Sequence, residues 1–261
     1  MKELNLDYIV IDEISMVSEC FYKYLLVLKR LKPTLKFIIA GNFDQLLPVN
    51  DRAKFNYQGS VALYDLCNGN RLDLTKCRRS DDICFNKCAP DNVQNLTPQD
   101  FGNVFTKRHL SYTNKTRIAI NELIMKEVVK QKKSKMPLKL SKLSYDKNSQ
   151  DVKLLSGMPI IARVNDKKLE IFNNETFTIK EIQHSKSNIL IIDEAGVTKN
   201  ISYDMFQKLF YVAFCITIHK SQGSTFDHPY TIHEWEHPGF DARLKYVALS
   251  RTTKLENINV V

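Results

Sequence analysis

Residues 8–16 read YIVIDEISM, an apolar run that ends in two adjacent carboxylates. Tyr8 to Ile11 form an unbroken block of aromatic and branched aliphatic residues, which predicts a central parallel strand buried on both faces. Such a strand places Asp12 and Glu13 at its carboxyl end, which faces the ligand crevice in open α/β sheets. Asp12 suits a carboxylate held against Mg²⁺, and Glu13 suits one that orients or deprotonates water. The alternative is a solvated turn, so the rest of the chain must decide.

Composition limits the class of protein. The 261 residues carry a formal charge of +9, which favours a polyanionic partner, nucleic acid rather than a membrane surface. No apolar run approaches the roughly 20 residues that span a bilayer, and the first residues do not resemble a signal peptide. We therefore expect an intracellular protein without a membrane contact. The closest cysteines, Cys77, Cys84 and Cys88, form no CxxC pair, so reduced thiols are expected rather than zinc.

The next elements repeat the strand–helix–strand order of a parallel α/β sheet. Ser18 is expected to cap a helix that runs to about Lys32, and residues 37–40 are expected to form a second strand. The loop GNFDQLLPV (41–49) then follows the carboxyl end of that strand. Its Gln45 could sense a terminal phosphate through the amide or could simply be solvated.

A pair of arginines lies further along, in LDLTKCRRSDDICF (72–85). A short strand is expected first, then Arg78 and Arg79, then a helix that begins at Ser80 or Asp81. Arginine at such a junction suits a phosphate, although a surface salt bridge to the neighbouring aspartates is the alternative. Residues 89–102 are polar and rich in turn formers, as in a linker.

A second α/β unit is expected from His109. The strand HLSYT precedes Asn114, which is expected to cap a long helix with an apolar stripe of Ile120, Leu123, Ile124 and Val128. The helix continues into the lysine-rich tail at 126–142. From Met158 the sequence predicts a small barrel, with short strands at 159–164, 176–182, 189–193 and 197–202.

The chain then returns to α/β character with LFYVAFCITIHKSQGSTFD (209–227). Residues 209–218 are expected to form one doubly buried strand, followed by the polar segment from His219. There Gly223 permits close backbone approach, and hydroxyls such as that of Ser221 could donate to phosphate oxygens. In LKYVALSRTT, a strand-like YVAL is expected to deliver Arg251 at its end.

In order, these blocks resemble the motif series of superfamily 1 DNA helicases, in the branch typified by the Pif and RecD helicases. DEISM resembles motif II, GNFDQLLPV motif III, the Arg78–Arg79 pair motif IV, TIHKSQGSTFD motif V and YVALSR motif VI. SYTNKTRIAIN is similar to a block in which Thr-Asn opens the first long helix of the second motor domain. The similarity covers nearly the whole chain.

The resemblance implies an α/β fold of RecA-like P-loop NTPase motor domains, with parallel sheets, flanking helices and an inserted small SH3-like β-barrel. Residues 1–70 would be the end of motor domain 1, residues 71–157 and 208–261 motor domain 2, and residues 158–207 the barrel. It further implies ATP hydrolysis with Mg²⁺, coupled to 5′ to 3′ movement along single-stranded DNA and duplex unwinding in replication, repair or recombination.

Site residues are carried over position by position. Asp12 would bind Mg²⁺, Glu13 would activate water, and Gln45 would sense the γ-phosphate that Arg79 and Arg251 reach from the opposite domain. Gln222 and Gly223 would link the nucleotide to DNA. The DNA track would consist of Thr113, Asn114, His219, Lys220 and Ser221. Phe43 and Trp235 are proposed to stack on bases.

Some positions depart from the family pattern. Asn42 replaces an aspartate, Leu47 replaces a proline, and Asn174 replaces the glycine of an Asn-Gly turn, although Asn tolerates the left-handed conformation. The residues contain no GxxxxGK[ST], the loop that cradles phosphates. We therefore expect the C-terminal part of a helicase that needs a P-loop portion in cis or in trans. The alternative is a non-catalytic, helicase-derived DNA-binding or adaptor protein.

Overall fold

The computed structural model describes residues 6–48, 56–132 and 136–261. Val49, the last residue of the GNFDQLLPV string, and residues 133–135 of the lysine-rich tail lie outside the described residues.

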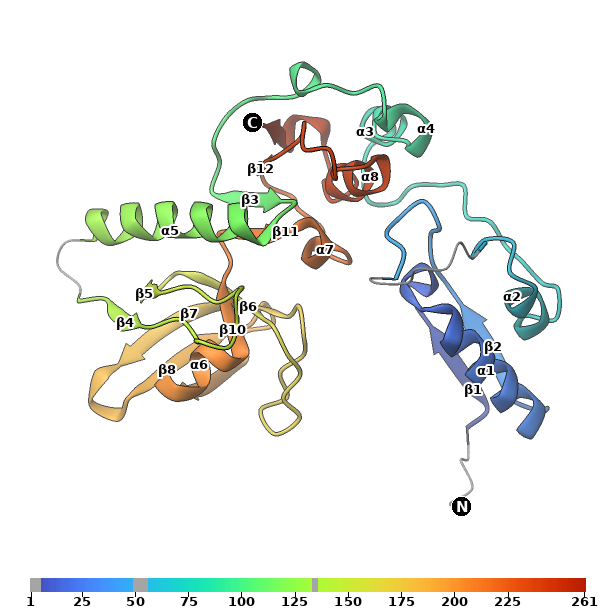
Figure 1. Cartoon of the computed structure of the whole chain (residues 1–261), viewed down its shortest axis with the longest axis horizontal. Helices are drawn as coiled ribbons and strands as arrows, with labels where there is room; N and C mark the ends of the chain where they lie inside the picture. Colours follow the sequence, from blue (N-terminus) through green and yellow to red (C-terminus); the bar gives the residue numbers. More distant parts are fainter. Residues whose placement is uncertain (1–5, 49–55, 133–135) are drawn as a thin grey trace. The chain divides into compact units, whose positions relative to one another are not determined.

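The chain divides into two compact units (Figure 1). The first contains Met1–Gln94 and Asp241–Val247, and the second contains Asn95–Phe240 and Ala248–Val261. Residues 71–94 therefore cluster with the first unit, whereas the sequence assigned them to the second motor domain.

The first unit is built on two parallel strands. Strand β1 (Tyr8–Ile11) pairs with β2 (Lys36–Ile39), and α1 (Glu19–Leu31) makes the connection between them. Ser18 lies at the N-cap of α1, which confirms the predicted helix. The other elements are the 3-10 helix η1 (Ile14–Met16), α2 (Val61–Leu66), α3 (Asp82–Lys87) and α4 (Pro90–Val93).

The expectation that β1 is buried on both faces is wrong. Tyr8 is 52% exposed and Val10 68% exposed, whereas Ile11 packs against a small core that includes Tyr22 of α1. In the described residues this sheet has two strands, and its apolar contacts with α1 lie on one face. The predicted parallel pairing is confirmed, but the second face of the sheet, which was predicted to be buried, is exposed.

A four-stranded parallel sheet organises the second unit. Its order is β11 (Cys215–Thr217), β3 (Arg108–Ser111), β12 (Tyr230–Ile232) and β13 (Ile258–Val260). Helix α5 (Asn114–Gln131) packs against β3 and β11.

The buried face of α5 is partly polar. Asn121 is fully buried, and its amide exchanges two hydrogen bonds of 2.9 Å with the backbone of Cys215 on β11. Leu123 was predicted to lie in an apolar stripe but is 52% exposed. The buried side chains are Arg117, Asn121 and Met125, because each is four residues from the next on one helical face.

Five antiparallel strands form an inserted sheet. Their order is β10 (Phe210–Val212), β6 (Pro159–Ala162), β7 (Thr176–Gln183), β8 (Asn188–Ile192) and β9 (Thr198–Ser202). This confirms the predicted short strands. In the described residues, the sheet is an open series from β10 to β9.

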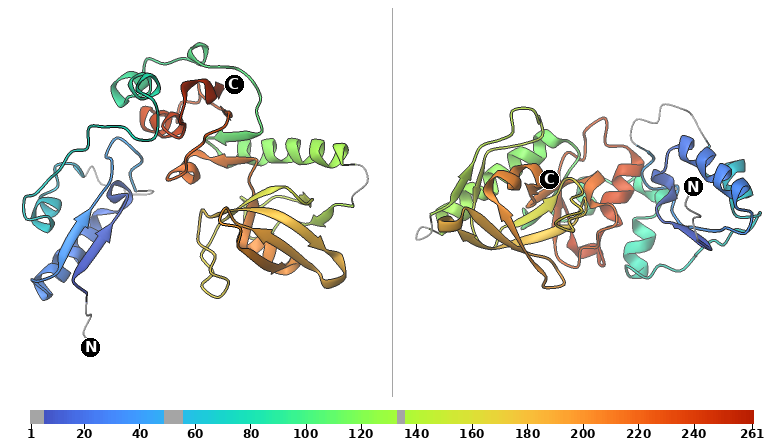
Figure 2. Two further views of the ribbon diagram at one scale, coloured as in Figure 1. Left: turned by 180° about the vertical axis from the view of Figure 1, so that it is seen from behind. Right: turned by 90° about the horizontal axis from the view of Figure 1, so that it is seen from below.

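The inserted sheet is covered by α6 (Tyr203–Leu209), which lies along its curved surface (Figure 2). A hairpin of β4 (Leu138–Leu140) and β5 (Val152–Leu154) adds to the same core. In this core the Phe210 ring centroid lies 5.7 Å from that of Phe177 and 5.6 Å from that of Phe206.

Three predicted strands are wrong. Residues 209–218 do not form one strand, because α6 ends at Leu209 and the following residues enter two different sheets as β10 and β11. YVAL belongs to α8 (Ala242–Leu249), since apolar residues of a short buried helix resemble a buried strand. No strand occurs at residues 72–80.

The remaining short elements are η2 (Pro98–Asp100), η3 (His184–Lys186), α7 (Ile218–Ser221) and η4 (Leu255–Asn257). Among the described residues, every helix is too short or too polar to cross a membrane.

Candidate nucleotide and nucleic-acid site

The Asp12–Glu13 pair follows β1 at the carboxyl end of the parallel pair, as predicted. Asp12 is exposed, and its Oδ1 accepts a 2.8 Å hydrogen bond from the backbone N–H of Glu13. Glu13 is half-buried and has a φ of 51°, a left-handed conformation that is rare for a residue with a side chain. Such backbone strain occurs often at functional sites.

The loop after β2 lies directly against this turn. Ile14 N–H donates to Ala40 O at 3.0 Å, and a Cβ built on Gly41 would lie 2.8 Å from Ile14 N. Only glycine permits this approach without a shift of the backbone. The two polar loops are therefore held side by side.

Gln45 lies in the loop after β2. Asn42 organises the turn, because its Oδ1 accepts from Asp44 N–H at 2.9 Å and its carbonyl accepts from Gln45 N–H at 3.2 Å. Phe43 is half-buried and packs against the core of Ile14, Tyr22 and Tyr57. The substitution of Asn42 for aspartate thus preserves a compact turn.

These groups suit Mg²⁺ and a nucleotide. In the described residues no three His, Cys, Asp or Glu side chains are grouped to enclose a metal. Mg²⁺ in nucleotide sites usually takes one or two carboxylates and completes its octahedron with phosphates and water. An exposed Asp12 next to Glu13, with the loop that carries Gln45 against the same turn, fits that arrangement.

The N-terminus of α5 is held by Glu234, which the sequence analysis did not identify. The Glu234 carboxylate accepts from Tyr112 N–H at 2.9 Å, from Thr113 N–H at 2.8 Å and from Thr113 Oγ1 at 2.7 Å. Burial acts to raise the pKa of Glu234, but hydrogen bonds from Thr113, Thr116 and Tyr112 hold that pKa below its ordinary value. Thr113, predicted on the DNA track, is also the N-cap.

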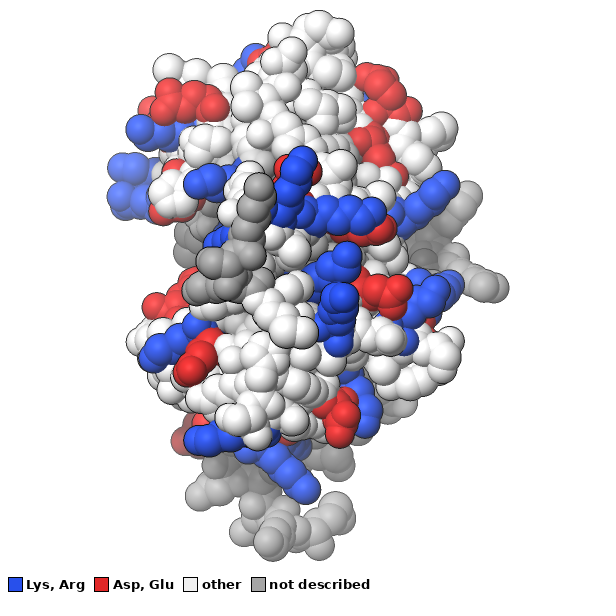
Figure 3. Space-filling view, turned by 90° about the vertical axis from the view of Figure 1, so that its left-hand side faces the viewer, with Lys and Arg blue, Asp and Glu red and all other residues white. Residues whose placement is uncertain are grey.

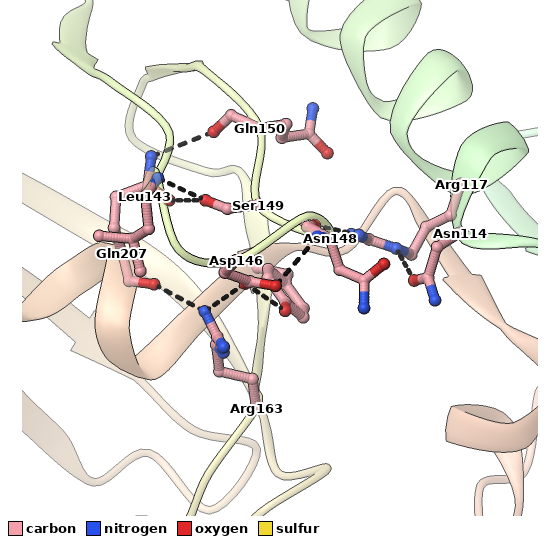
Figure 4. A network of polar contacts seen from close by, with 10 residues as sticks. Asn114, Arg117, Leu143, Asp146, Asn148, Ser149, Gln150, Arg163 and Gln207 are labelled. Carbon is pink, nitrogen blue, oxygen red and sulfur yellow. Dashed lines mark hydrogen bonds and ion pairs between the residues drawn. The ribbon is translucent and has the colours of Figure 1, made fainter.

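Arg117 supports the neighbouring Asn114 from within α5 (Figure 4). It is 1% exposed, and its Nε donates to Asn114 Oδ1 at 2.9 Å while Nη2 donates to Asn148 O at 2.6 Å. Burial lowers the pKa of Arg117. An arginine on the buried face of a predicted helix was the sequence signal for this network.

The network continues into the inserted sheet (Figure 4). Arg163 forms a 2.6 Å ion pair with Asp146, which also accepts from Tyr211 Oη at 2.8 Å. The Tyr211 ring has Arg117 at 4.5 Å and Arg163 at 4.8 Å from its centroid. Burial acts to raise the pKa of Asp146, but the hydrogen bonds and Arg163 lower it overall.

The segment after β11 contains the motif V residues. His219 and Gln222 are half-buried, and Gly223 has a φ of 84°, which glycine adopts readily. Ser221, expected to donate to DNA, is fully buried, and its hydroxyl donates to Ile218 O at 2.8 Å. The Lys220 ammonium, also expected on DNA, donates instead to oxygens of the inserted sheet.

Arg251 lies after α8 and is 1% exposed. Its Nη2 donates to Ser250 Oγ at 2.9 Å, and its carbonyl accepts from Phe226 N–H at 2.6 Å. The end of motif V and the end of motif VI are therefore joined within the second unit. Arg79 is exposed and lies in the first unit, just before α3.

Trp235 does not offer a stacking surface in this structure. It is 2% exposed, and its ring packs against Phe101 and Phe240 with centroid distances of 5.6 Å. The prediction that Trp235 stacks on a base is contradicted, because the faces of a base need an accessible ring. Its position after a parallel strand did not reveal this burial.

Residues 212–258 match the family described as UvrD-like helicase C-terminal domain. The region that contains motifs V and VI is therefore similar to the C-terminal domain of UvrD-like helicases.

Similarity over the whole chain is to Pif1 helicases. An ATP-dependent DNA helicase Pif1 of Campylobacter jejuni is 24% identical, and the match covers 100% of this chain and 71% of the relative. A structure of two Pif1 helicases at forked double-stranded DNA superposes with a TM-score of 0.73 at 21% identity, covering 97% of this chain and 68% of that one. Bacteroides Pif1 bound to single-stranded DNA gives a TM-score of 0.68 at 21% identity, with 97% and 70% covered.

The helicase-like α/β fold with a parallel sheet is shared with these structures. The whole chain is thus similar to Pif1 helicases, and its residues 212–258 are similar to a helicase C-terminal domain.

Proposed function

We propose that the chain is the C-terminal part of an ATP-dependent DNA helicase that couples ATP hydrolysis to 5′ to 3′ movement along single-stranded DNA and to duplex unwinding. One observation carries this proposal: the polar segments singled out by the sequence follow the carboxyl ends of parallel strands. Asp12–Glu13 follows β1, residues 41–45 follow β2, Thr113–Asn114 follows β3, and residues 218–223 follow β11. Ligands of open α/β sheets bind at those ends.

In this function Asp12 holds Mg²⁺, Glu13 activates the attacking water, and Gln45 senses the γ-phosphate. When bound, ATP would supply the phosphoryl group and Mg²⁺ would neutralise its developing charge. Arg251 and Arg79 bring positive charge to that group, and Gln222 with Gly223 connects the nucleotide to DNA. The turn around Gly41 and Asn42 supports these roles, because it holds the loop that carries Gln45 against the turn that follows Asp12–Glu13.

Single-stranded DNA is the proposed partner. The charge of +9 supports a polyanion, and Figure 3 shows lysines and arginines spread over one face with acidic side chains between them. Asn114 and His219 remain the proposed contacts, and Thr113 orders the helix that presents Asn114. A Pif1 structure with bound single-stranded DNA is among the similar ones.

We assign the P-loop to a separate segment, supplied in cis or in trans, since none occurs in these 261 residues. Two features of the first unit support an additional segment there. A cavity of about 770 Å³ lies beside β2 and is lined by residues 36–39 and 66–68, among others. Tyr8 and Val10 of β1 also leave apolar surface exposed.

From the sequence we propose residues 1–70 as the end of motor domain 1, residues 71–157 with 208–261 as motor domain 2, and residues 158–207 as a small SH3-like barrel, whereas in this structure residues 71–94 cluster with the first unit. Strands β6 to β9 lie within residues 158–207 and support the barrel, and β10 (Phe210–Val212) adds a fifth strand to the same sheet.

The test compares the 261-residue chain with a motor completed by a P-loop segment. We expect negligible ATP hydrolysis by the chain alone and DNA-stimulated hydrolysis by the complete motor, because the P-loop supplies the N–H groups and lysine that hold the phosphates. Glu13→Gln should abolish the stimulated rate, while Glu19→Gln, which removes a carboxylate from α1, should not. Full activity of the Glu13→Gln motor would refute the proposal.

A further inference from the structure

The ammonium of Lys220 donates hydrogen bonds to residues of the inserted sheet. Its Nζ donates to Asn174 Oδ1 at 2.7 Å, to Asn173 Oδ1 at 3.2 Å and, with a longer contact, to Ala162 O at 3.4 Å. A lysine has three N–H donors, so these oxygens account for all of them. The acceptors belong to the end of β6 and the loop before β7, whereas Lys220 belongs to α7.

Asn174 occupies a position where glycine would be less strained. Its φ is 72°, in the left-handed region, and its backbone N–H donates to Ala162 O at 3.0 Å. Asparagine tolerates this region at a cost that glycine avoids. Its side chain supplies the shortest of the three Lys220 contacts, which glycine could not make.

The surroundings of Lys220 are also cationic. Burial, together with Arg117 and Arg163, lowers its pKa to about 8. The carboxylate of Asp146 forms its ion pair with Arg163. A lysine in this environment offers little to a DNA phosphate, because its donors are used within the chain.

We propose that Lys220 is a positioning residue: it fastens the Asn173–Asn174 loop of the inserted sheet to α7 and does not contact DNA phosphate. The contacts that fasten the loop all lie within the second unit. The statement that Lys220 does not contact DNA phosphate rests on the proposed function.

Hydrogen exchange in the full 261-residue chain tests the fastening. The probes are the amides of Ile171 and Glu175, which donate to Asp166 O and Phe172 O within the loop. Lys220→Met and Asn174→Gly should each increase the exchange rate at both amides about fivefold to tenfold, the scale of one lost hydrogen bond. Asn174→Asp keeps an acceptor and should leave exchange close to the wild-type rate.

Ser187→Gly is the matched control. Ser187 lies between η3 and β8, in the connection between two strands of the inserted sheet, and has a φ of 51°, so glycine relieves a similar strain without removing a contact to Lys220. Exchange at the loop amides should not change in this variant. Wild-type exchange in either Lys220→Met or Asn174→Gly would overturn the proposal.

The double variant Lys220→Met/Asn174→Gly separates a direct pair from two independent losses. A direct contact predicts that the double variant exchanges no faster than the more affected single variant. Multiplied single effects, on the order of 25- to 100-fold if each is fivefold to tenfold, would show that the two residues act separately and would overturn the pairing.

The salt dependence of binding to oligothymidine tests whether Lys220 contacts a DNA phosphate. Each lost phosphate contact makes the negative slope of log affinity against log salt shallower by about 0.7 on single strands. Lys220→Met should keep the slope of Lys180→Met, which removes the same charge from an exposed position on β7. A slope that is shallower by about 0.7 in Lys220→Met but not in Lys180→Met would show that Lys220 contacts a phosphate. Loss of binding in the wild-type chain would count against the proposed function, whereas the exchange results would still decide the fastening.

Discussion

Arg251 combines burial with a fixed hydrogen bond. Only 1% of it is exposed, and Nη2 lies 2.9 Å from Ser250 Oγ. An exposed ion pair would contribute only about 0 to 1 kcal/mol and would tolerate lysine. A guanidinium that forks onto phosphate oxygens would not, because lysine lacks the planar pair of donors.

We therefore expect Arg251→Lys to slow DNA-stimulated ATP hydrolysis by about 10³- to 10⁵-fold in the complete motor, the range for arginine fingers. Arg243→Lys on the exposed side of α8 is the control and should retain activity. Near-normal hydrolysis by the Arg251→Lys motor would remove Arg251 from the catalytic residues.

His109 should make the protein sensitive to acid. It is fully buried, its Nδ1 lies 3.0 Å from His233 Nε2, and burial together with His233 lowers its pKa to about 4. The unfolded chain takes up this proton near pH 6.5, whereas the folded chain resists it until about pH 4. Protonation therefore favours unfolding in that window, with a loss of up to about 3 kcal/mol.

Urea unfolding at pH 7, 5.5 and 4.5 would measure this loss. His109→Gln should have a flatter dependence on pH, whereas His228→Gln, at an exposed position, should follow the wild type. An equally steep dependence in His109→Gln would assign the acid sensitivity to other groups.

Glu234 should stabilise the start of α5. Its carboxylate accepts three hydrogen bonds from Tyr112 and Thr113, and charge-assisted bonds of this kind are stronger than neutral ones. Glu234→Gln should reduce the free energy of unfolding by about 1 to 3 kcal/mol and speed amide exchange at Thr113. Glu236→Gln, at an exposed position nearby, should change neither measurement, and an unchanged Glu234→Gln chain would show that the three bonds contribute little.

At the scale of elements, periodicity and caps were sufficient where a segment had one clear environment. The predicted helix after Ser18 and the strands of the inserted sheet are present because each alternates or repeats in a way that matches its buried face. YVAL failed because four apolar residues fit a buried strand and a buried helix equally well. Residues 209–218 failed because one apolar run serves two sheets.

The site was predictable where its residues follow a strand. Asp12 and Glu13 could be placed from the sequence because an apolar block ends at them. Glu234 and Asn174 could not, since their roles depend on partners more than 40 residues away in the chain and on left-handed backbone angles of 65° and 72°. Trp235 was misassigned because the sequence does not show that two phenylalanines cover it.

For the molecule as a whole, the charge of +9 predicts binding to single-stranded DNA that weakens as salt rises and depends little on base sequence. Fluorescence anisotropy with labelled oligothymidine and a mixed-sequence oligonucleotide would measure both properties. Similar affinities and a negative salt slope are expected. Absence of binding at low salt would move the DNA track to residues outside this chain.

On its C-terminal side, the inserted sheet is connected to the four-stranded parallel sheet by Ala213 and Phe214, which lie between β10 and β11. Both ends of this link are tied, because Ala213 N–H donates to Pro159 O at 2.9 Å and Phe214 O accepts from His109 N–H at 2.8 Å. Two residues span at most about 7 Å, so the link has almost no slack. A pull on the inserted sheet would therefore reach the strand that precedes His219 as tension in the backbone, whereas a longer connection would absorb the same pull by straightening.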